Sequence, residues 1–195
     1  MADPSGDDPA VDEGLLLRRI RRGDVQALSL LIRRYQQRLF HLTLRVCGDA
    51  TLAEEATVES FYKIWRNARQ WRDETGPSAW ICRIAVRTVL DLNRGRRRWR
   101  RRTRIAGEAR EQDSASDIIQ DLIERERQER LTDAVDRALA VLKAEDRALV
   151  HMYYFENMRL REIAPILDAS QDALKMRLSR ARQKLKDLLE DFDNE

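Results

Sequence analysis

The stretch 158–192 constrains the fold most, because its apolar residues recur three and four positions apart, the spacing that places side chains on one helical face. The first series is Leu160, Ile163, Ala164 and Leu167, and the second is Leu174, Leu178, Ala181, Leu185 and Leu188. Asp168 to Ser170 separates them, and the Ser170 hydroxyl can cap the second helix. The sequence therefore predicts a short helix, a tight turn and a longer helix.

The second helix of this pair is strongly basic on its remaining faces. Its cations are Lys175, Arg177, Arg180, Arg182, Lys184 and Lys186. A short helix, a turn and a longer basic helix form the layout of a helix-turn-helix, whose second helix enters the DNA major groove. A surface hairpin with solvated arginines has the same spacing, so the stretch favours DNA binding but leaves that alternative open.

Helical spacing also runs through most of the remaining chain. We predict helices over 12–23, 24–48 and 49–67, a loop over 68–77, a helix from Ser78, and further helices from Glu129. Residues 1–11 have the composition of an acidic tail, and residues 105–127 that of a flexible acidic linker. The sequence therefore predicts an all-α protein of two small helical domains, residues 12–104 and 128–192, joined by this linker.

Composition excludes several classes of protein. The chain has 195 residues, 36% of them charged, and no apolar run of the length that spans a membrane. Its acidic start lacks the pattern of a signal peptide, so we expect a cytoplasmic protein without membrane insertion. Two isolated cysteines and two isolated histidines suggest neither a disulfide nor a metal site. With no phosphate-binding or nucleophile motif either, we expect no catalytic residue, cofactor or enzymatic activity.

Two charge clusters lie in the first predicted domain. Glu54, Glu55 and Glu59 gather on the outside of the third predicted helix, where they form either a solvated face or a docking surface for a basic protein. The run from Arg94 to Arg104 holds eight arginines in eleven residues, which repel one another in a compact fold. A nucleic-acid backbone is the partner that such a run favours, with a solvated tail or an acidic protein as the alternative.

Four motifs occur in order along the chain. They are Arg22-Gly23-Asp24; Ala53-Glu54-Glu55 continuing through Glu59-Ser60-Phe61 and Trp65-Arg66; Ala79-Trp80-Ile81-Cys82-Arg83-Ile84-Ala85; and Arg161-Glu162-Ile163-Ala164 with Arg177-Leu178-Ser179-Arg180-Ala181-Arg182. Through them the chain, from about Leu15 to Leu189, resembles the extracytoplasmic-function (ECF) sigma factors of the sigma-70 family. These are small bacterial promoter-recognition subunits with domains called sigma-2 and sigma-4.

The resemblance implies a subunit that directs core RNA polymerase to promoters and assists their opening. Its implied partners are the β′ coiled coil and the β flap of the polymerase, promoter DNA, and an anti-sigma factor or other inhibitor. The residues implied to dock the polymerase are Glu54, Glu55, Val58 and Glu59. Those implied at the minus ten element are Trp71, Trp80, Arg83, Arg87, Asp91, Arg94, Arg97 and Arg98, and those at the minus thirty-five element are Lys175, Met176, Arg177, Ser179, Arg180 and Arg182.

Several positions depart from the family pattern. Val58 stands where the family usually has Gln, Arg87 where Asn is more usual, and Asp172 in a turn that is typically small or Gly-Thr. Arg159 occupies a position expected to hold a Ser or Thr cap, and Pro165 removes an amide from a helix, which predicts a short or kinked helix there.

Three other hypotheses stay open at this stage. One is a stand-alone helix-turn-helix regulator that binds duplex DNA without polymerase. Another is a nuclease whose metal would be held by the three glutamates of the third helix. The last concerns control, because phosphorylation of Thr57 could add negative charge beside Val58.

Overall fold

The computed structural model describes residues 12–72, 76–103 and 139–193, and every element in these ranges is a helix, which confirms the predicted all-α fold. The elements are α1 (Glu13–Arg21), α2 (Val25–Cys47), α3 (Ala50–Asn67), the 3₁₀ helix η1 (Ala68–Gln70), α4 (Pro77–Thr103), α6 (Ala144–Tyr154), α7 (Leu160–Leu167) and α8 (Gln171–Asp193). The predicted tail 1–11 and linker 105–127 lie outside the described residues. No described helix is long and apolar enough to cross a membrane.

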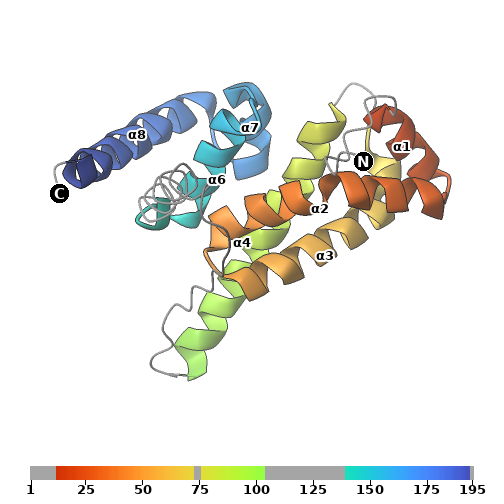
Figure 1. Ribbon diagram of the computed structural model, residues 1–195, viewed down its shortest axis with the longest axis horizontal. Helices are drawn as coiled ribbons and strands as arrows, with labels where there is room; N and C mark the ends of the chain where they lie inside the picture. Colours follow the sequence, from red (N-terminus) through yellow and green to blue (C-terminus); the bar gives the residue numbers. More distant parts are fainter. Residues whose placement is uncertain (1–11, 73–75, 104–138, 194–195) are drawn as a thin grey trace, which may run out of the picture.

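The first module consists of α1 to α4 with η1. In Figure 1, α2 and α3 run side by side and α4 crosses them. Local capping sets the boundaries. The Asp24 carboxylate accepts a hydrogen bond from the Ala27 amide at 3.1 Å, and Asp49 caps α3 in the same way through the Leu52 amide at 2.8 Å. Gly48 ends α2 with a φ of 69°, a conformation that costs glycine little.

Helix α4 is longer than its apolar pattern alone predicts. It continues through the arginine run as far as Thr103, and its green end projects beyond the other helices in Figure 1. The Arg96 guanidinium donates to Asp49 at 2.9 Å, which ties the start of this basic extension to the N-cap residue of α3. The described part of the run is therefore an ordered helix rather than a tail.

The second module consists of α6, α7 and α8. Helix α7 has eight residues and contains Pro165, in agreement with the short helix predicted there. Although Arg159 is not a Ser or Thr, the Glu162 side chain accepts a hydrogen bond from the Arg159 amide at 2.7 Å and satisfies one exposed donor. Ser170 caps α8 as predicted, its hydroxyl accepting from the Ala173 amide at 3.2 Å.

The two modules pack against each other. Their buried apolar side chains form one contiguous cluster that runs from α1 to α8. Helix α6 lies against α2, and α7 contacts α4. The Arg147 side chain of α6 is buried and donates from Nε to the Val46 carbonyl, near the end of α2, at 2.9 Å. The two predicted domains are thus recognisable as helix groups, but their cores are continuous in this structure.

Candidate nucleic-acid interface

Helix α4 presents a polar stripe opposite its buried side. Ile81, Ala85 and Val89 are fully buried, whereas four polar residues follow one another at three-and-four spacing on another face: Arg83, Arg87, Asp91 and Arg94. Arg83 is half-buried and the other three are exposed, and Arg97 and Arg98 extend the exposed cations along the helix. These predicted site residues therefore lie along one helix, and we call them the α4 stripe. A strand of nucleic acid that runs along α4 can contact them in turn.

The cations of this stripe influence each other. Burial and the neighbouring Arg87 charge lower the pKa of the Arg83 guanidinium. One stripe carboxylate, Asp91, accepts a hydrogen bond from Arg94 at 3.4 Å. Repulsion between Arg83 and Arg87 is relieved by a bound anion, so the pair favours a phosphate or another acceptor beside it.

The same stripe meets the second module. The Arg87 guanidinium donates from Nη2 to the Pro165 carbonyl of α7 at 2.7 Å, and Arg94 lies 3.7 Å from a carboxylate oxygen of Glu145, in the first turn of α6. Both cations therefore have an acceptor in the second module, although their side chains remain exposed.

Two predicted residues of the minus ten site require correction. The exposed fraction of Trp71 is 2% and that of Trp80 is 9%, so both indoles belong to the hydrophobic cluster. Trp71 packs beside Gly14 of α1, where a β-carbon would meet the indole at 3.4 Å. A base cannot stack on a ring whose faces are covered by protein. We therefore assign both residues to packing rather than to a base pocket.

Helix α8 carries the second basic face. Its buried side is formed by Leu174, Leu178 and Ala181, and the opposite side exposes Lys175, Met176, Ser179, Arg180 and Arg182. These five predicted residues share the accessible face of the second helix of a helix-turn-helix, the part that enters a major groove in proteins of this layout.

Arg177 differs from its neighbours on α8. It is half-buried, and its Nε donates to the Asp146 carboxylate of α6 at 2.7 Å. This charge-assisted bond fixes the angle of α8 on α6. Arg177 thus has a structural partner within its own module.

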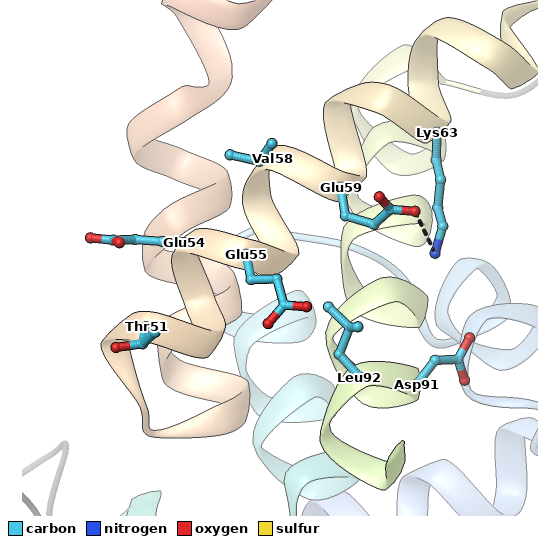
Figure 2. A pocket seen from close by; sticks show the side chains of 8 residues that line it. All are labelled: Thr51, Glu54, Glu55, Val58, Glu59, Lys63, Asp91 and Leu92. Carbon is cyan, nitrogen blue, oxygen red and sulfur yellow. Dashed lines mark ion pairs between the residues drawn. The ribbon is translucent and has the colours of Figure 1, made fainter. Parts of the chain in front are cut away.

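The acidic surface of α3 is open to solvent. A shallow depression between α3 and α4 is lined by Thr51, Glu54, Glu55, Val58, Glu59, Lys63, Asp91 and Leu92 (Figure 2). Val58 is 71% exposed, and Glu59 lies 3.7 Å from Lys63. Glu54 points away from Glu55 and Glu59 in Figure 2. In the described ranges no cluster of His, Cys, Asp and Glu is arranged to hold a metal ion, so nothing there favours the nuclease hypothesis.

Thr57 lies on the other side of α3. Its hydroxyl is buried, donates to the Ala53 carbonyl at 2.7 Å and lies 3.1 Å from the Thr43 hydroxyl. A kinase cannot reach this oxygen in the folded protein. The structure therefore argues against the hypothesis that Thr57 is phosphorylated.

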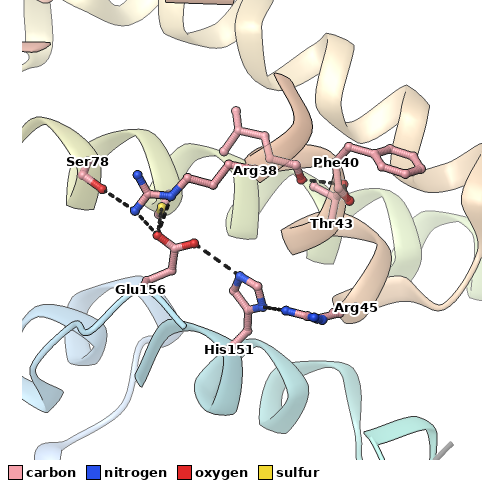
Figure 3. Close-up of polar contacts among 9 residues, drawn as sticks. Arg38, Phe40, Thr43, Arg45, Ser78, His151 and Glu156 are labelled. Carbon is pink, nitrogen blue, oxygen red and sulfur yellow. Dashed lines mark hydrogen bonds and ion pairs between the residues drawn. The ribbon is translucent and has the colours of Figure 1, made fainter. Parts of the chain in front are cut away.

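A polar cluster between the modules was not predicted (Figure 3). Glu156, in the turn after α6, accepts a hydrogen bond from Arg38 Nε at 2.8 Å and lies 3.3 Å from His151 Nε2. The buried Cys82 thiol lies 3.5 Å from the same carboxylate. Arg38 also donates to the Ser78 hydroxyl at 2.9 Å. No local motif marks these residues, because the chain separates Arg38 from Glu156 by 118 positions.

Burial alone would raise the pKa of Glu156, but hydrogen bonds from His151 and Arg38 outweigh it and lower the pKa to about 2. Conversely, burial and the neighbouring Glu156 raise the pKa of the Cys82 thiol, which therefore stays protonated. Glu156 is thus a buried carboxylate that stays ionised because both modules supply its partners.

Two family models match this chain in the order that the motifs predict. The model of sigma-70 region 2 matches residues 31–105, and that of sigma-70 region 4 matches residues 132–185. The first match contains the α4 stripe and the acidic face of α3, and the second contains the exposed face of α8. The chain belongs to the sigma-70 family.

Curated relatives define the type of sigma factor. The ECF RNA polymerase sigma factor SigK of Mycobacterium tuberculosis is 28% identical over 181 residues, which cover 92% of this chain and 94% of SigK. The RNA polymerase sigma-H factor of Pseudomonas aeruginosa is 25% identical over 171 residues, which cover 86% of this chain and 89% of that protein. This sigma factor is therefore of the ECF type, a transcription initiation factor that binds RNA polymerase and promoter DNA.

Solved structures share its fold. CnrH, solved in complex with the cytosolic domain of CnrY, matches with a TM-score of 0.62 and 20% identity over 91% of this chain and 97% of CnrH. RpoE from Bartonella quintana, solved with the anti-sigma factor NepR, matches with a TM-score of 0.66 and 19% identity over 83% of this chain and 96% of RpoE. At these identities the likeness shows the fold alone.

Proposed function

We propose that this sigma factor uses three separate surfaces: the acidic face of α3 to dock the polymerase, the α4 stripe at the minus ten element, and the exposed face of α8 at the minus thirty-five element. The observation that carries the proposal is that both basic faces fall within the matched sigma-70 regions and lie on separate helices. Such a protein needs no chemistry of its own, and it acts in the cytoplasm, where polymerase and chromosome meet.

The α4 stripe is suited to an opened strand. Arg83, Arg87 and Asp91 supply both donors and an acceptor for base edges, while Arg94, Arg97 and Arg98 supply charge for the backbone. Binding the exposed strand more tightly than the duplex provides the free energy for opening, so no nucleotide hydrolysis is required. Because Arg87 replaces the usual Asn, its long guanidinium favours a guanine-type acceptor pair over adenine.

The α8 face is suited to an intact duplex. Lys175, Met176, Ser179 and Arg180 are exposed on the first half of the helix, the half that approaches base edges in helix-turn-helix proteins. Arg182 lies further along and is placed for a phosphate. Arg177 contributes by holding α8 on α6 through Asp146.

The α3 surface is suited to a basic partner such as the β′ coiled coil. Glu54 and Glu55 are exposed on either side of a ridge formed by Val58, which replaces the usual Gln with an apolar contact. The flanking charges give orientation, and burial of Val58 adds apolar contact area. Because the solved relative RpoE is bound to an anti-sigma factor, we also propose an inhibitor that competes for these surfaces.

Run-off transcription with purified core polymerase on a promoter library tests the function. We expect the protein to support promoter-specific transcripts, and Arg87→Ala to reduce them about tenfold or more, since one base contact contributes about 1–3 kcal/mol. Arg33→Ala removes an exposed arginine from α2 and serves as the matched control, with transcription unchanged. Tight specific duplex binding by the free protein, without stimulation of core polymerase, would instead establish a stand-alone regulator.

Docking is tested separately by core binding. Glu55→Lys reverses a charge on the proposed docking surface and should weaken binding to core polymerase about tenfold, whereas Asp187→Lys makes the same change on exposed α8 and should not. Equal effects of the two variants would contradict an α3 docking surface.

A further inference from the structure

Met176 is a large apolar side chain on a face of α8 that otherwise holds polar or small residues. Its exposed fraction is 57%, and no other large apolar side chain of α8 is exposed among those that the structure describes. Leu174, Leu178 and Ala181 are buried, and Leu185 packs against the same core. Single apolar residues are common on protein surfaces, so the place of Met176 on the helix decides what it can do.

The helix points Met176 away from the core. Each residue of an α-helix turns by about 100°, so Leu174 and Leu178, two positions before and after Met176, lie nearly opposite to it. Both leucines are buried, and the bond of Arg177 to Asp146 at 2.7 Å holds α8 on α6. The direction of Met176 is therefore fixed by packing on the other side of the helix.

Small neighbours leave Met176 free to make a close contact. Ala173 and Ser179, one turn before it and one turn after it, are both exposed and have short side chains. A base edge can therefore approach the helix closely at Met176, and the unbranched thioether can adjust to that edge. The adjacent Lys175 and Arg180 supply hydrogen-bond donors, so Met176 adds a different kind of contact to the face.

The major groove displays one apolar group that suits such a side chain, the 5-methyl group of thymine. The other base edges there present donors and acceptors. A methionine placed on them covers these polar groups without giving them a hydrogen bond, which costs free energy. Methionine has no donor and only a weak acceptor, so it cannot replace the water that those edges lose. Thymine is therefore the base that Met176 favours.

We propose that Met176 selects a thymine in the minus thirty-five element by packing its thioether against the 5-methyl group of that base. The proposal rests on the function proposed above and names one base that α8 recognises, whereas a cationic residue at this position would prefer guanine or a phosphate. It predicts that promoters recovered from the run-off library share a T·A pair at one position of this element.

Uracil substitution tests the contact, because uracil differs from thymine only in lacking this methyl group. The probe is a promoter duplex recovered from the library, in which each thymine of the minus thirty-five element is replaced in turn by deoxyuridine. Fluorescence anisotropy measures the affinity of the holoenzyme for each duplex. We expect one replacement to weaken binding by the wild-type holoenzyme about fourfold, the factor that burial of one methyl group supplies.

Protein variants assign the lost affinity to Met176. Met176→Ala should bind the thymine and uracil duplexes equally, whereas Met176→Leu should keep most of the difference between them. Lys175→Ala is the matched control, because it removes a neighbouring exposed side chain: it should weaken binding to both duplexes alike and keep their ratio. Met176→Ala should also keep the wild-type free energy of unfolding in urea, since the side chain is exposed, and a loss of stability would indicate a structural role instead.

Three further outcomes would overturn the inference. They are a wild-type holoenzyme that binds every uracil duplex as tightly as the thymine duplex, a Met176→Ala variant that still distinguishes the two, and recovered promoters that share no T·A pair in this element. Run-off transcription separates the two proposals. If the holoenzyme makes no promoter-specific transcripts, the proposed function and the thymine contact both fail; if it makes them but does not distinguish thymine from uracil, only the thymine contact fails.

Discussion

Trp71 shows how one residue can fit both a packing role and a binding role until its surroundings are known. An aromatic residue in a polar loop is typical of a base-stacking site, and the resemblance pointed the same way. In the structure the indole is buried within the hydrophobic cluster and lies beside Gly14 of α1. A covered ring stabilises the fold by removing apolar area from water, and it cannot bind a base at the same time.

The first prediction follows from this burial. Trp71→Ala should lower the free energy of unfolding by about 3–5 kcal/mol, because it leaves a large cavity beside α1 within the first module. Trp71→Phe should cost clearly less, since the smaller ring keeps most of the packing. Urea denaturation followed by circular dichroism measures both, and a stable Trp71→Ala variant that fails only in promoter opening would restore the base-pocket assignment.

The second prediction concerns acid sensitivity. The pKa of Glu156 is lowered to about 2, from an ordinary value of 4.5, and it is faced by Arg38 of α2, Cys82 of α4 and His151 of α6. Because its folded-state pKa lies below the unfolded one, its contribution to stability is complete above about pH 4.5 and is lost as pH falls toward 2. The difference in unfolding free energy between wild type and Glu156→Gln should therefore shrink as the pH falls below about 4.5. Urea titrations at each pH measure it, and a difference independent of pH down to 3 would contradict this account.

At the scale of the element, α8 combines two functions on one helix. Its apolar side, with Leu174 and Leu178, joins the core, and its opposite side is exposed for DNA. Arg177 lies at the boundary, where its bond to Asp146 sets the angle of the helix. The periodicity of the sequence separates the two sides but does not show which boundary cation turns inward.

The third prediction separates Arg177 from Lys175. Arg177→Ala should lower the free energy of unfolding by about 1 kcal/mol, the scale of a partly exposed charge-assisted pair, whereas Lys175→Ala should leave it unchanged. In holoenzyme binding to the minus thirty-five element, Lys175→Ala should lessen the salt dependence by about one counterion. Urea denaturation of both variants and DNA binding at several salt concentrations test this prediction. If Arg177→Ala is as stable as the wild type, Arg177 is better assigned to a phosphate contact than to a structural one.

At the scale of the whole molecule, the continuous core couples the two modules. Apolar residues from α1 to α8 form one cluster, and the buried Arg147 donates to the Val46 carbonyl across the boundary. Such coupling resists local separation but does not forbid it, because the contacts of the α4 stripe lie near the surface.

The fourth prediction tests this coupling. Heat denaturation of the wild-type protein should give one transition, with equal calorimetric and van't Hoff enthalpies, because both modules share a core. Arg147→Ala leaves the Val46 carbonyl without this buried donor and should separate the transition into two. Differential scanning calorimetry measures both, and two transitions in the wild type would show that the modules fold independently.

The helices and their order could be predicted from the sequence, because their signals are local. Apolar spacing gives the faces of α2 and α8, and residues such as Asp24, Gly48 and Ser170 mark the ends through capping and positive φ. The exposed residues of α8 followed from the same spacing. The four ordered motifs were enough to indicate the family, which the family models then confirmed.

Only the tertiary structure decided which surfaces meet. A period of 3.6 residues shows that a face is apolar or charged, but it does not say which distant element covers that face. For this reason Trp71 was assigned to a surface that it does not occupy, and the contact of Arg38 with Glu156 was not foreseen. The sequence determined a set of helices with apolar and charged faces. The tertiary structure decided which of these faces meet, because contacts between residues more than a hundred positions apart, such as Arg38 and Glu156, depend on how whole helices pack.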